Sequence, residues 1–167
     1  MACAMKHIDH KYLLDILNYD PETGVFRWSK PRPKIRVGQQ AGSLHHKGYV
    51  YLEIDGRHCA AHRLAWFYMT GEKPEKSIDH INRNKSDNRF ANLRLAEHGQ
   101  NRANSKHNNK NGFKGVTHHK WLKSKPYQAQ ITHNRKVIYL GCYATPEEAN
   151  KAYQEAAERL HGEFARP

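Results

Sequence analysis

The stretch Ile78-Asp79-His80-Ile81-Asn82, followed by Asn92-Leu93-Arg94 and then by Asn101, dominates the interpretation of this chain. The carboxylate of Asp79 suits a hard divalent cation, and the amide oxygen of Asn101 offers a neutral ligand to the same cation. The imidazole of His80 is largely neutral near pH 7 and can take a proton from water. Together these groups predict metal-assisted hydrolysis of a phosphodiester bond.

The surroundings of this stretch predict two short strands joined by a polar loop. Residues 77–78 lead into the first strand, residues 82–88 form the loop, residues 90–95 form the second strand, and a helix carrying Asn101 follows. Neighbouring strand side chains point to opposite faces, so Asp79 and His80 must lie where the strand opens into the loop. Asn92 could hydrogen-bond across the loop and fix the histidine ring. Two protein oxygens, several waters and a phosphate suit Mg²⁺ or Mn²⁺ better than Zn²⁺.

The charge of the chain indicates a polyanionic partner. The 167 residues include 28 Lys and Arg against 16 Asp and Glu, a formal net charge of +12. The charge is uneven, because residues 94–136 contain a single acid, Glu97. Nucleic acid is the simplest partner for such a chain. A basic protein whose charge serves solubility alone is the alternative.

Other classes of protein are disfavoured. No apolar stretch approaches the length that spans a bilayer, and the N-terminus lacks the apolar segment of a secretion signal. The three cysteines are far apart in sequence, which supports neither a disulfide framework nor a four-cysteine zinc site. We therefore expect a cytoplasmic protein with no membrane association and no small-molecule cofactor.

Short helices and strands alternate before the loop. His62 is expected to enter a helix with its ring satisfied by local backbone groups. Asp55-Gly56 is a strong two-residue hairpin turn. We expect a helix over residues 9–18, a turn over 20–24, strands over 25–28, 49–54 and 57–61, and a helix over 62–69 that Gly71 and Pro74 end.

Residues 102–111 read as a tether, because the run has almost no apolar content to bury. Its basic residues could follow phosphates: Arg102, Lys106 and Lys110.

A second unit follows, with strands expected over 115–119, 127–132 and 136–141 and a tight turn at Asn134-Arg135. Thr145-Pro146-Glu147-Glu148 predicts a capped helix that runs to about His161 and stops at Gly162. The apolar stripe of this helix is expected to comprise Ala149, Ala152, Tyr153, Ala156 and Leu160. In the middle strand, Tyr127, Ala129 and Ile131 alternate with Gln128, Gln130 and Thr132, so one face meets the helix and the other is polar.

The first unit resembles the HNH nucleases, which use a ββα-metal fold, and in particular their phage and intron-associated homing branch. The residues that match are 78–82, Asp87-Asn88-Arg89, Asn92-Leu93-Arg94, Asn101, His62-Arg63-Leu64-Ala65-Trp66 and 19–26. The resemblance implies that His80 is the general base, that Asn92 is the middle asparagine of the motif, and that Asp79 and Asn101 bind one Mg²⁺ or Mn²⁺. Many members of the family carry a second histidine at the position of Asn101. Asparagine at this position agrees with the homing branch.

The second unit resembles the APETALA2/ethylene-response-factor DNA-binding domain, a three-stranded antiparallel sheet packed on one helix. The residues that match are Gly112-Phe113-Lys114-Gly115-Val116, Tyr127-Gln128-Ala129-Gln130-Ile131, Tyr139-Leu140-Gly141-Cys142-Tyr143 and Thr145-Pro146-Glu147-Glu148-Ala149. That family lays its sheet in the major groove. The residues expected to contact DNA are Lys114, His119, Lys120, Trp121, Gln128, Gln130, Thr132, Arg135, Lys136 and Tyr139. Thr117 and Val137 stand where the plant proteins often have arginine, so the plant target site does not carry over.

The sequence thus predicts an α+β protein with a ββα-metal (HNH) nuclease body and an N-terminal β-rich extension. Residues 1–101 would form the nuclease region (1–70 and the motif at 71–101), residues 102–111 the tether, and residues 112–167 the DNA-binding unit. The predicted function is a site-specific, homing-type DNA endonuclease of phage kind that acts on double-stranded DNA as a monomer and nicks one strand per active site. A non-catalytic, sequence-specific DNA-binding regulator and an RNA-binding module remain the alternatives.

Overall fold

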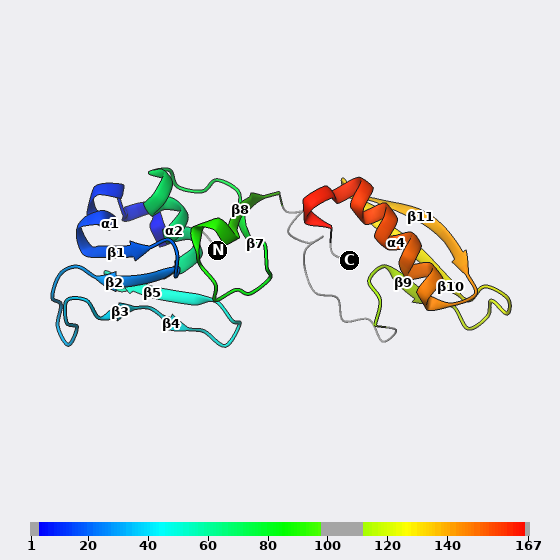
Figure 1. Cartoon of the computed structure of the whole chain (residues 1–167), viewed down its shortest axis with the longest axis horizontal. Helices are drawn as coiled ribbons and strands as arrows, with labels where there is room; N and C mark the ends of the chain where they lie inside the picture. The colour runs from blue at the N-terminus through cyan, green and yellow to red at the C-terminus, as the bar shows by residue number, and fades with distance from the viewer. Residues whose placement is uncertain (1–3, 98–111, 166–167) are drawn as a thin grey trace. The chain divides into compact units, whose positions relative to one another are not determined.

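The computed structural model describes residues 4–97 and 112–165 (Figure 1). The chain divides into two compact units, Met1–Ala96 and Glu97–Pro167. The predicted tether and the predicted helix carrying Asn101 lie outside the described residues. Within the described part, every helix is too short or too polar to cross a bilayer.

Unit 1 consists of short elements, so its core has to be shared between several of them. In chain order they are η1 (Ala4–His7), α1 (His10–Ile16), β1 (Leu17–Asp20), β2 (Val25–Trp28), β3 (Gln40–Ala41), β4 (Ser43–Leu44), β5 (Val50–Ile54), β6 (Arg57–Ala60), α2 (Ala61–Thr70), β7 (Ser77–His80), η2 (Phe90–Asn92) and β8 (Leu93–Ala96).

Three small antiparallel sheets build unit 1, with strand orders β1-β2-β3, β4-β5-β6 and β7-β8. One hydrophobic cluster joins all three sheets and both helices. Its largest fully buried members include Phe26, Leu13, Leu17, Leu52, Ile54 and Leu64. The site described below is therefore built on elements that share one core.

The first helix is shorter than the sequence predicts. Helical spacing suggested a helix over residues 9–18, and Asp9 does cap it by accepting a hydrogen bond from the Tyr12 amide. The helix nevertheless ends at Ile16, because Leu17 is extended and pairs with Trp28 on β2. Strand pairing and full burial of Leu17 outweigh the local helical pattern here.

The hairpin between β5 and β6 is confirmed. Asp55 and Gly56 both have positive φ, 51° and 73°, as a two-residue turn of this handedness requires. The chain then enters α2 at Ala61, and Gly71 ends the helix in the left-handed conformation. Arg63 ties α2 to the segment before β7 through a 2.8 Å hydrogen bond from its guanidinium to the Pro74 carbonyl.

The strand predicted over residues 90–95 is partly wrong. Residues Phe90–Asn92 form a 3-10 turn, and the strand begins at Leu93. The reason is tertiary: the Phe90 amide donates to the Pro21 carbonyl, and the Phe90 ring lies 5.6 Å from the ring of Trp66. The β7-β8 pair supplies two strands of the expected ββα body, while its helix falls outside the described residues, so the complete body stays a prediction.

Unit 2 is a three-stranded antiparallel sheet with one long helix against it (Figure 1). Its elements are β9 (Val116–His118), β10 (Tyr127–His133), β11 (Lys136–Tyr143), α4 (Pro146–His161) and η3 (Gly162–Phe164). The turn at Asn134 and Arg135 is confirmed, with φ of 49° and 64°. The strands β10 and β11 contain one irregularity that the sequence did not predict, a register shift between Ala129 and Gln130.

The predicted helix boundaries and sheet faces of unit 2 are confirmed. Thr145 caps α4 by accepting from the Glu148 amide, Pro146 opens the helix, and Gly162 follows its end. On β10, Ala129 and Ile131 are buried against the helix, whereas Gln130 and Thr132 are exposed. Of the predicted stripe on α4, Ala149, Tyr153 and Ala156 are buried and Ala152 and Leu160 are half-buried, while Ala157 is an additional buried residue.

Candidate active site

His80 is the last residue of β7 and is almost completely buried, with 4% of its surface exposed. Its Nε2 lies 3.3 Å from Oδ1 of Asn88. The amide of Asn88 is oriented by its other end, because its Nδ2 donates to the Ser86 carbonyl at 3.1 Å. Oδ1 can only accept, so this contact is a hydrogen bond in the tautomer that carries the proton on Nε2. In that tautomer the unprotonated nitrogen is Nδ1, which can accept a proton.

Burial keeps His80 neutral. Desolvation lowers the pKa of His80 below its ordinary value, and this effect outweighs the hydrogen bond to Asn88 and the charge of Asp79, which raise it. A neutral imidazole at physiological pH is the form that a general base requires.

A second histidine packs against the first. The rings of His62 and His80 are 5.2 Å apart and edge to face, and the ring of Tyr49 lies 5.3 Å from His62. Burial lowers the pKa of His62 to about 3, with a further contribution from His80. Nδ1 of His62 is buried and has no hydrogen-bond partner among the described residues. The expectation that local backbone groups satisfy this histidine is therefore wrong for Nδ1.

Asp79 forms a buried ion pair with Arg94. Both Nε and a terminal nitrogen of Arg94 donate to Oδ2 of Asp79 at 3.0 Å. The two residues are direct cross-strand partners on β7 and β8, which places their side chains next to each other. The carboxylate predicted to bind a cation thus has an arginine as its partner in the free chain.

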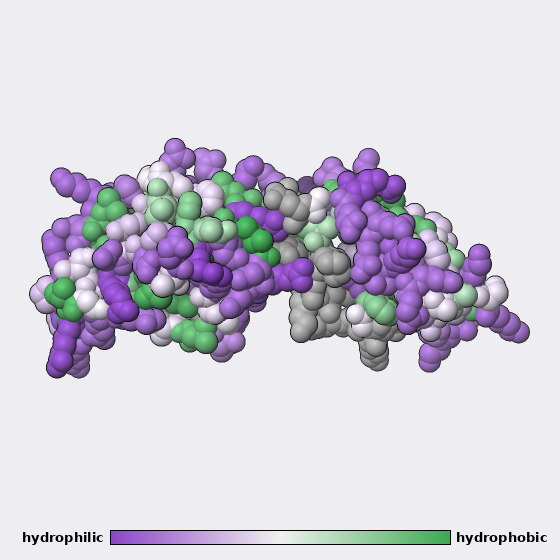
Figure 2. All heavy atoms as spheres, in the orientation of Figure 1, coloured by the Kyte–Doolittle hydropathy of each residue, from purple (hydrophilic) through white to green (hydrophobic). Residues whose placement is uncertain are grey.

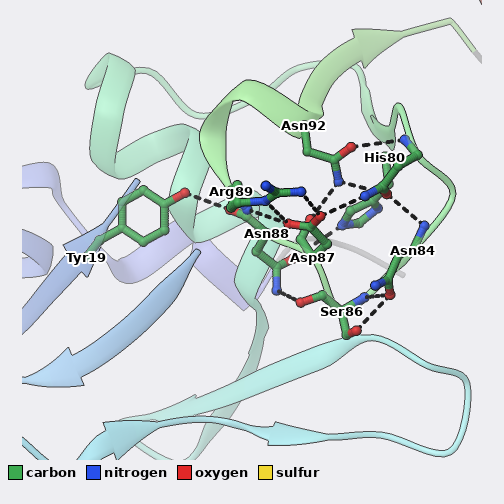
Figure 3. A network of polar contacts seen from close by, with 9 residues as sticks. Tyr19, His80, Asn84, Ser86, Asp87, Asn88, Arg89 and Asn92 are labelled. Carbon is green, nitrogen blue, oxygen red and sulfur yellow. Dashed lines mark hydrogen bonds and ion pairs between the residues drawn. The ribbon is translucent and has the colours of Figure 1, made fainter. Parts of the chain in front are cut away.

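The loop between β7 and β8 is organised by Asn92 (Figure 3). Its side chain accepts from the Asn82 amide at 3.0 Å and donates to the Asp87 carbonyl at 2.8 Å. Its backbone carbonyl accepts from the Ile81 amide. The predicted hydrogen bond across the loop is present, but the contact with the histidine ring comes from Asn88, not from Asn92.

A charged pair closes the same loop. Arg89 donates to both carboxylate oxygens of Asp87, at 2.8 and 2.6 Å, and Asn82 donates to Asp87 at 2.7 Å. These contacts, with the Arg89 hydrogen bond foremost, lower the pKa of Asp87 to about 2. Asp87 therefore acts as a permanently charged brace of the loop near neutral pH.

The donor chemistry fits a cation that is held by few protein oxygens. The described residues contain no group of three or more His, Cys, Asp or Glu side chains that could cage a metal ion. Asp79 offers one carboxylate, and the second predicted ligand, Asn101, lies outside the described residues. One or two protein oxygens completed by water and phosphate are typical of Mg²⁺, and dedicated protein cages are not.

The residues predicted to contact DNA fall into two groups. Arg102, Lys106 and Lys110 lie outside the described residues. The other ten belong to unit 2; Lys114, His119 and Gln128 are half-buried, and the exposed ones are Lys120, Trp121, Gln130, Thr132, Arg135, Lys136 and Tyr139. Gln130 and Tyr139 are cross-strand partners, as are Thr132 and Val137, so these exposed side chains share the sheet face opposite the helix.

Sequence reasoning missed the roles of Asn88 and Arg94. Both residues belong to the motif that drew attention, but their partners are set by folding: Asn88 reaches His80 from eight positions along the loop, and Arg94 reaches Asp79 across the hairpin. The cross-strand register of β7 and β8 could have indicated the second pair, whereas no local signal distinguishes Asn88 from the other asparagines of the loop.

Comparisons with known proteins identify the family of this chain. The family profile described as HNH endonuclease matches residues 59–103, which include α2, β7, the loop and β8. An uncharacterized HNH endonuclease of Acanthamoeba polyphaga mimivirus is 40% identical over 149 residues, which cover 88% of this chain and 69% of the viral protein. No solved structure matches the chain. The chain belongs to the HNH endonuclease family.

Proposed function

We propose that this protein is a metal-dependent, site-specific DNA endonuclease that hydrolyses phosphodiester bonds. Membership of the HNH endonuclease family supports nuclease activity on DNA. The observation that supports the proposal is the environment of His80: the ring is buried, its pKa is lowered by desolvation, and its Nε2 contacts Oδ1 of Asn88. This is the arrangement that activation of a water molecule for attack on a phosphate requires.

In this proposal each residue of the site has a distinct role. His80 accepts the proton of the attacking water through Nδ1. Asn88 holds the ring from Nε2, and Asn92 keeps the loop closed around it. Asp79 and Asn101 would hold one Mg²⁺ or Mn²⁺, which would stabilise the negative charge on the scissile phosphate and on the leaving oxygen.

In this proposal Asp79 has to exchange its partner Arg94 for the cation. Arg94 is paired with the Asp79 carboxylate, so a cation bound by Asp79 would have to compete with this guanidinium. This predicts weak cation affinity without DNA and stronger affinity with it, because the phosphate adds a ligand and negative charge.

We further propose that unit 2 recognises the DNA site. Its outer sheet face presents Gln130 and Thr132, which can hydrogen-bond base edges, next to the exposed ring of Tyr139. Arg135 and Lys136 at the β10-β11 turn supply positive charge for phosphates. The exposed side chains of this sheet face are the basis for proposing an APETALA2-like use of the sheet. Figure 2 shows the other side of the unit, which carries α4, and hydrophilic residues dominate there as well.

The remaining features of the proposal follow from one active site per chain. A monomer would nick one strand of double-stranded DNA, and a double-strand break would need a second chain or a second event. The resemblance to the phage and intron-associated branch suggests a homing role.

A nicking assay tests the proposal. Supercoiled plasmid carrying candidate target DNA should be converted to the open circular form by the protein with Mg²⁺ or Mn²⁺, and EDTA should stop the reaction. His80→Ala should reduce the nicking rate by about a hundredfold or more while the protein still binds DNA. Folded wild-type protein that binds DNA but never nicks it with either cation would support the non-catalytic regulator instead. Equal affinity for duplex DNA and structured RNA would support the RNA-binding alternative.

A further inference from the structure

A turn far away in the sequence contacts the loop that carries Asn88. The turn connects β1 and β2 at residues 21–24, more than sixty positions before Asn88. The Tyr19 hydroxyl donates to the Asn88 carbonyl at 2.6 Å, and the Phe90 amide donates to the Pro21 carbonyl at 3.2 Å (Figure 3 shows the first of these). The backbone on both sides of Arg89 is thus bonded to the β1-β2 hairpin.

Gly24 brings the two segments closer than any other residue could. A Cβ atom at Gly24 would lie 2.4 Å from the Arg89 amide nitrogen and 2.5 Å from the Asn88 carbonyl carbon. Both atoms belong to the backbone, so no side-chain rotation could relieve the overlap. The Gly24 φ of 71° is also one that other residues rarely adopt.

The contacted residue is the one that holds the catalytic ring. Asn88 is 2% exposed; its carbonyl is fixed by Tyr19, and its side-chain Oδ1 meets Nε2 of His80. A displacement of the Asn88 backbone therefore moves the hydrogen-bond acceptor of the His80 ring. Tyr19 is itself held by stacking on Phe26, with ring centroids 4.6 Å apart.

We propose that the β1-β2 turn is a positioning element of the active site, in which Tyr19, Pro21 and Gly24 act through Asn88 to set the tautomer and orientation of His80. These three are positioning residues, since none of them touches the reacting atoms. The catalytic consequence rests on the proposed role of His80 as general base, whereas the orientation of the ring does not. The turn would thus explain why the N-terminal strands and the nuclease motif belong to one compact unit.

A matched pair of alanine variants tests this proposal. Gly24→Ala introduces the overlap with the Asn88 backbone. Gly56→Ala has nearly the same φ, 73°, but its Cβ would meet no atom within 4 Å. The two positions share this left-handed φ, so the difference in their surroundings is the contact of Gly24 with the loop. The β5-β6 turn has no part in the proposed chemistry.

Three measurements are made on each full-length variant. We expect Gly24→Ala to lower kcat for plasmid nicking by about a hundredfold, the loss that a misplacement of about 1 Å produces. Metal-free DNA affinity should stay at the wild-type value, and Gly56→Ala should keep the wild-type kcat. In metal-free protein, the imidazole ¹⁵N shifts of His80, assigned by loss of the signals in His80→Gln, should report the Nε2-protonated tautomer in wild type and Gly56→Ala but a tautomer mixture in Gly24→Ala.

Tyr19→Phe is the second variant, because it keeps the stacked ring and removes only the bond to the Asn88 carbonyl. We expect kcat to fall about fivefold, as for one lost neutral hydrogen bond, with unchanged DNA affinity and a shifted His80 tautomer ratio. If Gly24→Ala does not fold, the Tyr19→Phe spectrum decides alone.

The outcomes separate this inference from the proposed function. Wild-type His80 shifts in both Gly24→Ala and Tyr19→Phe would overturn the positioning role, as would equal losses of kcat in Gly24→Ala and Gly56→Ala. Wild-type protein without nicking activity, but with a tautomer that responds to Gly24→Ala, would overturn the enzyme proposal and leave the positioning contact in place.

Discussion

Four asparagines within eleven residues have four different structural roles. Asn82 braces Asp87, Asn84 turns the chain by accepting from the Ser86 amide and hydroxyl, Asn88 holds His80, and Asn92 joins the two ends of the loop. Asparagine suits all of these positions because its short amide carries both donors and an acceptor. Residue type alone therefore indicates a loop, and the partner decides the role.

The buried His62 makes the stability of the chain depend on pH. The pKa of His62 is about 3 in the folded chain, against about 6.5 in an unfolded chain. The unfolded state thus binds an extra proton between these values, so the contribution of His62 to stability is complete above pH 6.5 and is lost as the pH falls toward 3. The free energy of unfolding should decrease by about 1.4 kcal/mol per pH unit from this group in the middle of that window.

Denaturant unfolding of wild type and His62→Gln between pH 4.5 and 8 (roughly the window of histidine titration) measures this effect. The free energy of unfolding of the variant should fall less steeply with decreasing pH. The difference in slope should correspond to about one proton fewer taken up on unfolding. His80 remains in both proteins, so the difference between them reports His62 together with its interaction with His80. Parallel curves would contradict the prediction.

At the scale of elements, the side-chain ion pair between Asp79 and Arg94 joins the strands β7 and β8 in addition to their backbone hydrogen bonds. The side chains of Asp79 and Arg94 are 7% and 12% exposed, so neither charge is well solvated without the other. Breaking a buried pair by removing one partner costs about 3 to 5 kcal/mol, because the remaining buried charge loses its oppositely charged partner.

Arg94→Gln should therefore lower the metal-free stability by about 3 kcal/mol or more. If Asp79 holds a cation, Mg²⁺ should restore more stability in Arg94→Gln than it adds to wild type, because the cation replaces the missing positive charge. Thermal unfolding with Mg²⁺ and with EDTA provides the measurement.

Arg89→Gln is the control, since it breaks the Arg89–Asp87 pair, in which the side chains are 51% and 13% exposed. The arginine of this pair is solvated, so this variant should lose clearly less stability than Arg94→Gln. Equal destabilisation by the two variants would show that burial does not govern the Asp79–Arg94 pair.

Elements of the two units differ in how they could be predicted. The cap at Thr145, the stop at Gly162 and the turn at Asn134 are local, and each was predicted correctly. The end of α1 at Ile16 and the 3-10 turn at Phe90 were not, because both depend on strands or carbonyls that are distant in sequence. Local signals are reliable where the hydrogen-bond partner lies within a few residues.

At the scale of the whole molecule, the chain combines a nuclease motif in one unit with a basic sheet in the other. The net charge of +12 implies that DNA binding releases counterions, so affinity should fall steeply with salt. If the outer face of unit 2 contacts phosphates, Arg135→Ala should reduce the slope of log affinity against log salt by about one.

Lys151→Ala removes the same charge from an exposed position on α4, the element that packs against the opposite face of the sheet. Its slope should remain that of wild type. Filter binding or fluorescence anisotropy from about 50 to 200 mM salt supplies both slopes. Identical slopes for Arg135→Ala and Lys151→Ala would argue against the sheet face as the DNA-binding surface.

The sequence by itself determined the family motif, the turns, the caps and the alternation of buried and exposed residues on β10, because each depends on neighbouring residues or on a fixed periodicity. The tertiary structure alone decided that Asn88 contacts the His80 ring, that Arg94 forms an ion pair with Asp79, and that the turn at Gly24 lies against the loop. These three contacts join residues 8, 15 and more than 60 positions apart. Such contacts form only when the strands have found their partners and the core has closed around them.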